Sequence, residues 1–175
     1  MTPALDALKV GVLVFVAAVL QASIVGAFDI GGGRPDLLLV TIVAVALVGG
    51  TAPGAAAGFF AGLVFDLATF ETLGVTSLLL TLAGYWIGRY GETTGRGRAH
   101  APLLSVLVMT VAYAVAGYVF HTLLGDTVSA GVALGSSLPA AIVGNLLLTV
   151  PVFALVRRLL ARQPAEALRE VRLLG

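Results

Sequence analysis

The feature that most constrains this chain is a series of long apolar runs separated by short polar or glycine-rich breaks. A helix needs about 20 mostly apolar residues to cross a bilayer, with a range of roughly 17–25. We predict an all-α polytopic membrane protein, with one compact six-helix transmembrane bundle in 1–160 and a cytoplasmic amphipathic tail in 161–175. The predicted spans are residues 10–28, 35–50, 53–70, 74–90, 102–124 and 138–157.

Composition agrees with a membrane solvent. The 175 residues are 59% hydrophobic and only 11% charged, whereas soluble domains carry roughly 45–50% apolar and about 25% charged residues. The formal net charge of +1 gives no bulk field that would attract nucleic acid. The chain has no cysteine, which excludes disulfides, thiolate metal sites and a cysteine nucleophile.

Basic residues predict the orientation of the spans. Six crossings place both termini on one side, together with the loops at 49–53 and 91–101. Arg34 is the one basic residue on the other side. Cytoplasmic loops are enriched in lysine and arginine, so we expect both termini in the cytoplasm. The nine residues on that side are Lys9, Arg89, Arg96, Arg98, Arg157, Arg158, Arg162, Arg169 and Arg172.

The third predicted span carries a stripe of small residues. Gly54, Gly58 and Gly62 recur every four residues and are followed at the same spacing by Asp66, so they lie along one helix face. Glycines at this spacing allow two helix backbones to approach closely within lipid. The face packs either against the protein's own helices, which we favour, or against a helix of a partner.

Three polar residues fall within or beside the spans. An ionisable group inside a span is costly and usually faces the bundle interior, so we hypothesise that Asp66 pairs with Arg34, which lies at the same depth. A structural salt bridge is favoured over a proton relay or ion coupling. Asn145, in the middle of the sixth span, is expected to hydrogen-bond across helices.

The sequence offers no catalytic, cofactor-binding or metal site. His100 and His121 are the only histidines and fall on opposite sides of the membrane in this topology. They therefore cannot share a metal, and the same scarcity argues against Ser-His-Asp catalysis. Gly31-Gly32-Gly33-Arg34 lacks the lysine and hydroxyl residue of a phosphate-binding loop. The stretch 125–137 fits either a loop or an interfacial turn.

Several short motifs stand out in about the first ninety residues. They are Gln21-Ala22-Ser23, Arg34-Pro35-Asp36-Leu37-Leu38-Leu39, the run from Gly58 to Leu67, Gly74 and Gly84-Tyr85. Together these motifs resemble those of the MreD family, the rod shape-determining membrane proteins of bacterial cell-wall elongation. Beyond them the resemblance rests on size, span count and the basic tail, and the loop before the sixth span is longer than is typical of the family.

The resemblance implies a non-enzymatic scaffold of the elongation machinery (the elongasome) in the bacterial cytoplasmic membrane, which maintains rod shape. Its implied partners are MreC, then RodA, a class B penicillin-binding protein and MreB in the wider complex, with the lipid bilayer around it. No cofactor is implied. The implied fold is similar to that of the S components of energy-coupling-factor transporters. Stoichiometry stays open, and a homo-oligomer is one of the choices.

The alternative function is the substrate-binding S component of a vitamin or metal uptake transporter. Such a subunit needs a polar or aromatic pocket at its outer face and an Ala-xxx-Ala-like face for its coupling partner. Here the outer loops offer few pocket groups, and Ala55-Ala56-Ala57 lies in the third span rather than the first. A membrane enzyme would need polar groups clustered at one depth, which the spans do not offer.

Overall fold

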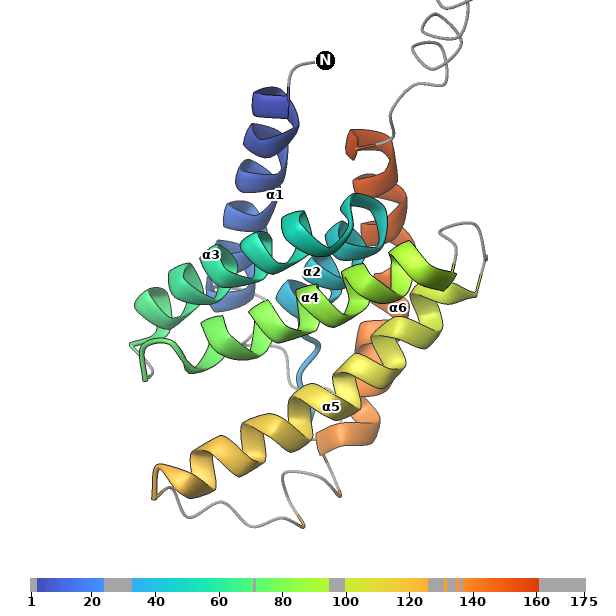
Figure 1. Cartoon of the computed structure of the whole chain (residues 1–175). Coiled ribbons are helices and arrows are strands. Elements are labelled where there is room, and N and C mark those ends of the chain that lie inside the picture. The colour runs from blue at the N-terminus through green and yellow to red at the C-terminus, as the bar shows by residue number, and fades with distance from the viewer. Residues whose placement is uncertain are drawn as a thin grey trace, which may run out of the picture.

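The computed structural model describes residues 3–23, 33–70, 72–94, 100–125, 131, 135 and 137–160. Over these residues the chain is all-α and forms six helices (Figure 1). The predicted tail, 161–175, lies outside the described residues, as does most of 125–137. The helices are α1 Pro3–Ser23, α2 Leu37–Gly49, α3 Thr51–Thr69, α4 Val75–Thr94, α5 Ala101–Leu123 and α6 Ser137–Leu160.

The helices differ in how well they suit a bilayer. In the described part of the chain, α1, α3, α5 and α6 are long and apolar enough to cross a membrane. Helix α2 has 13 residues and a length of about 20 Å at 1.5 Å per residue, against a hydrocarbon core of about 30 Å. Helix α4 is the least apolar of the six and ends in a polar turn. The six predicted spans therefore divide into four that qualify by length and hydropathy and two that do not.

Helix α2 forms the centre of the bundle. Its ten residues from Leu38 to Leu47 are all buried, and it packs against each of the other five helices. A helix that is apolar on every side belongs inside a protein or a membrane, and this one is enclosed by its own neighbours. Asp36 caps its start, where Oδ1 accepts a hydrogen bond from the amide of Leu39 at 2.8 Å. Gly50, with φ 97°, ends it and leads directly into α3.

The other helices surround α2 in an uneven way. Helices α3 and α4 form a closely packed antiparallel pair that crosses in front of α2 in Figure 1, while α1 and α6 run more upright on either side. Helix α5 packs against α6, and its last turns expose Val115, Val119 and Leu123. Exposed apolar side chains of this kind are compatible with lipid as the surrounding solvent.

One end of the bundle collects four chain segments. The Lys9 ammonium lies 3.5 Å from the carbonyl of Leu159, which joins the start of α1 to the end of α6. The amide of Thr51 donates to Glu92 at 2.8 Å, which joins the turn between α2 and α3 to the end of α4. Asp6, Pro53 and Leu160 line one groove at this end, so both pairs meet there. The arrangement agrees with an even number of crossings.

Candidate functional site

The glycine face of α3 is closed by α4 of the same chain. A Cβ added at Gly54 would lie 2.6 Å from Cβ of Ala46 on α2 and 2.7 Å from the carbonyl oxygen of Gly84 on α4. Cβ atoms at Gly58 and Gly62 would clash with the α4 backbone at Leu80 and Ser77. Backbones this close leave no room for any side chain. A partner helix on this face would therefore have to displace α4. We call Gly54, Gly58 and Gly62, with the α4 residues opposite them, the closed face.

Helix α4 contributes its own glycines to this contact. A Cβ at Gly84 would clash with the carbonyl of Gly54, and one at Gly88 would lie 2.5 Å from the Cα of Thr51. The sequence pattern was not used to predict that Gly84 and Gly88 pack against α3. The signal was present, because they are four residues apart in the helix that follows the glycine stripe.

Asp66 is buried, but its partner is not Arg34. Its side chain is fully enclosed, and Oδ2 accepts a hydrogen bond from the amide of Gly74 at 2.7 Å. Gly74 immediately precedes α4, so the carboxylate lies at the positive end of that helix, which favours a negative charge. Arg34 is exposed and forms no ion pair with Asp66 in the described residues. The hypothesised pair is therefore wrong: a helix N-terminus takes the place of the arginine.

Asn145 connects three helices near the start of α2. It is almost completely buried, and its Oδ1 accepts from the amide of Asp36 at 2.6 Å. Its Nδ2 donates to Oγ1 of Thr110 at 3.0 Å. One side chain of α6 therefore binds both the segment before α2 and the middle of α5. Such bonds matter in a bilayer because no water is available for unpaired backbone groups.

Gln21 completes this network from α1. Its Oε1 accepts from the amide of Leu37 at 2.8 Å, and its Nε2 donates to the carbonyl of Pro35 at 3.2 Å. The first amides of a helix have no partner within that helix, and here α1 and α6 each supply one. Gln21 was not among the predicted polar sites, although a glutamine inside a long apolar run is itself a signal.

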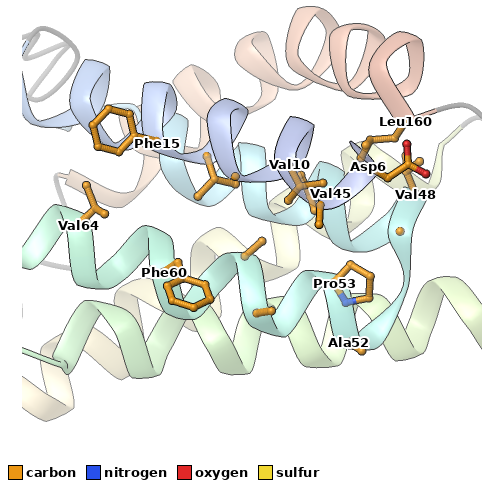
Figure 2. A pocket seen from close by; sticks show the side chains of 16 residues that line it. Asp6, Val10, Phe15, Val45, Val48, Ala52, Pro53, Phe60, Val64 and Leu160 are labelled. Atoms are coloured by element: carbon orange, nitrogen blue, oxygen red, sulfur yellow. The ribbon is translucent and has the colours of Figure 1, made fainter. Parts of the chain in front are cut away.

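An open groove lies between α1 and α3, with a volume of about 950 Å³. Figure 2 shows Phe15 on α1 and Phe60 on α3 along its two sides, with Val45 of α2 between them. Both phenylalanines are more than half exposed. Asp6 is the only charged group among the described lining residues. This groove, which we call the α1–α3 groove, is therefore an apolar surface that the described helices leave uncovered.

Small residues form much of the groove walls. Helix α1 contributes Ala7 and Gly11, and α3 contributes Ala52, Ala56 and Ala57. A Cβ added at Gly11 would meet nothing within 4 Å, in contrast to each glycine of the closed face. Small side chains allow a further helix to approach closely. The groove therefore combines an apolar lining with small side chains on both walls.

Comparison with known proteins gives one family. The family model described as rod shape-determining protein MreD matches residues 4–159, which covers all six helices except the ends of α1 and α6. No curated protein and no solved structure matches the chain, so the predicted similarity to S components stays a prediction. With nearly nine-tenths of its length matched, this chain belongs to the MreD family of rod shape-determining membrane proteins.

Proposed function

We propose that this protein is a non-enzymatic scaffold of the cell-wall elongation machinery that binds MreC through the α1–α3 groove. The family supports a role in rod shape, and the open apolar groove is the observation that favours a helix-binding scaffold. The closed face is occupied by α4, so the groove is the better candidate surface. RodA, a class B penicillin-binding protein and MreB would then join the assembly as its wider partners.

The dimensions of the groove suit a helix. The α1 wall runs from Asp6 to Phe15 and the α3 wall from Ala52 to Val64, which correspond to about 14 Å and about 18 Å of helix. The apolar lining suits a membrane-spanning segment of the partner.

The proposed orientation follows from the charges at one end. Lys9, Arg89, Arg157 and Arg158 belong to the end of the bundle where α1 begins and α6 ends. Basic residues favour the cytoplasmic side, so this end would face the cytoplasm. The mouth of the groove near Asp6 and Leu160 would then open toward the cytoplasmic leaflet.

Substitution of Gly11 tests the proposal. Gly11→Leu places a bulky side chain in the groove at a position where an added Cβ meets nothing within 4 Å, and leucine favours the helix more than glycine does. We expect a stable variant that no longer co-purifies with MreC. Cells depleted of the natural protein and supplied with this variant should stay round. Gly117→Leu on α5 is the matched control, because a Cβ there also meets nothing within 4 Å. Normal MreC capture by Gly11→Leu would overturn the groove assignment.

An S component is the remaining alternative function. It predicts that loss of the protein impairs uptake of a vitamin or metal while rod shape is kept. Depletion with both readouts in one strain separates the two functions, because a scaffold of the elongation machinery predicts rounding with uptake unchanged.

A further inference from the structure

A second cavity lies at the start of α2, where the segment from Gly33 to Asp36 passes between α5 and α6. Its volume is about 450 Å³. It is smaller than the α1–α3 groove and differs from it in chemistry, since most of its named lining groups are polar. These polar groups are Arg34, Asp36, Thr110, Tyr113, Ser137 and Asn145.

The cavity holds opposite charges that do not pair with each other. Arg34 and Asp36 are two residues apart, and both line the cavity. Neither forms an ion pair within the described part of the chain. The Asp36 carboxylate caps α2 through the amide of Leu39, with the amide of Leu38 also directed at it, and it has no cationic partner among the described residues.

The walls hold these charges in place. The hydrogen bond from the amide of Asp36 to Asn145 at 2.6 Å and the close approach of Gly33 to Ala140, 2.8 Å from an added Cβ, fix the segment on α6. Asn145 binds both the amide of Asp36 and the hydroxyl of Thr110, so it positions the charged segment against α5 and α6. A site of this kind is preorganised by its own hydrogen bonds.

From this geometry we infer that the cavity binds a zwitterionic headgroup that carries a phosphate and a primary ammonium, as in phosphatidylethanolamine. The Arg34 guanidinium suits a phosphate through paired hydrogen bonds, and the Asp36 carboxylate suits the ammonium. Leu39, Leu138 and Ala141 also line the cavity and would contact the apolar part of the lipid. This site is independent of MreC binding.

Two other lipid classes fit less well. A net anionic headgroup would meet the Asp36 carboxylate, which repels it. A quaternary ammonium, as in phosphatidylcholine, cannot donate hydrogen bonds and is usually held by several aromatic rings, whereas Tyr113 is the only aromatic residue in the described lining. The site therefore predicts a preference for ethanolamine over both glycerol and choline headgroups.

Native mass spectrometry of the full chain, titrated with each of the three lipids, tests this inference. We expect phosphatidylethanolamine to bind about tenfold more tightly than phosphatidylcholine or phosphatidylglycerol, as one charge-assisted hydrogen bond would give. Glycerophosphoethanolamine, the free headgroup, is the fourth ligand. Comparable binding of the free headgroup would support the charge recognition and assign the site to a soluble zwitterion instead of a lipid.

Two variants separate the roles of the charges. Arg34→Gln should lower affinity for the ethanolamine lipid by about tenfold. Asp36→Asn keeps an oxygen that caps α2 but removes the negative charge, so it should shift preference toward phosphatidylglycerol. Arg89→Gln is the control, because Arg89 is an exposed arginine of α4 near the opposite end. Equal binding of all three lipids, or unchanged selectivity in both variants, would overturn the inference.

Discussion

Helix α3 has two faces made of small residues, and they have opposite environments. The closed face meets the backbone of α4 with no space to spare, whereas the face with Ala52, Ala56 and Phe60 borders the open α1–α3 groove. Small residues therefore do not by themselves distinguish internal packing from a partner surface. The difference lies in the helix opposite each face: Gly84 and Gly88 of α4 match the first face, while α1 contacts α3 but leaves a groove beside the second face.

The largest effect is expected from filling the closed face. Gly58→Leu would force a side chain into the carbonyl of Leu80, and we expect a loss of about 3 kcal/mol in the free energy of unfolding. Thermal unfolding in detergent measures it. Ala56→Leu, on the groove side of the same helix, should change stability by less than about 0.5 kcal/mol. Equal losses in both variants would remove the distinction between the two faces.

A smaller loss in the free energy of unfolding is expected from substitutions of Asp66, at the end of the closed face. Asp66→Leu removes the acceptor of the Gly74 amide, and an unpaired buried donor costs about 1–3 kcal/mol. Asp66→Asn retains an oxygen in the same position and should lose less. Thermal unfolding of the two variants in the same detergent measures which one loses more stability. If the two are equally destabilised, the charge at the start of α4 matters and the hydrogen bond does not.

The smallest effect on stability is expected in the groove. Phe60 is 63% exposed, so Phe60→Ala should change the free energy of unfolding by less than about 0.5 kcal/mol. The amount of MreC captured by the Phe60→Ala variant should fall by roughly tenfold if the ring anchors the partner. Trp86→Ala on α4 removes an aromatic ring with the same 63% exposure that is absent from the groove lining. Similar losses of capture in both variants would argue against a specific groove.

The local pattern predicted part of this architecture, and packing between distant segments determined the rest. The spacing of Gly54, Gly58 and Gly62 predicts a close helix contact, since it depends only on the period of a helix. The partner of Asp66 was missed because charge matching pointed to Arg34, while the actual donor is a backbone amide that no side-chain pattern reveals. The shortness of α2 was visible in the sequence, but its complete burial was not.

The groove could not be predicted for a different reason. Its α1 wall includes Ala7 and Gly11, residues that are unremarkable in any apolar helix. The groove lies where α1, α2 and α3 pack against one another, so its shape depends on how three helices meet. The same holds for the cavity beside Arg34 and Asp36, whose walls come from segments as far apart in sequence as α2 and α6.

The hydrogen bonds at the start of α2 also set an order of assembly. Gln21, which binds the amide of Leu37, is synthesised before α2, so α1 can receive the short helix as it leaves the ribosome. Asn145, which binds the amide of Asp36, follows 109 residues later. The central helix is therefore only half secured until the last helix enters the membrane. A chain that ends before α6 would leave the amide of Asp36 without this acceptor in a nonpolar solvent, where an unpaired backbone group is costly.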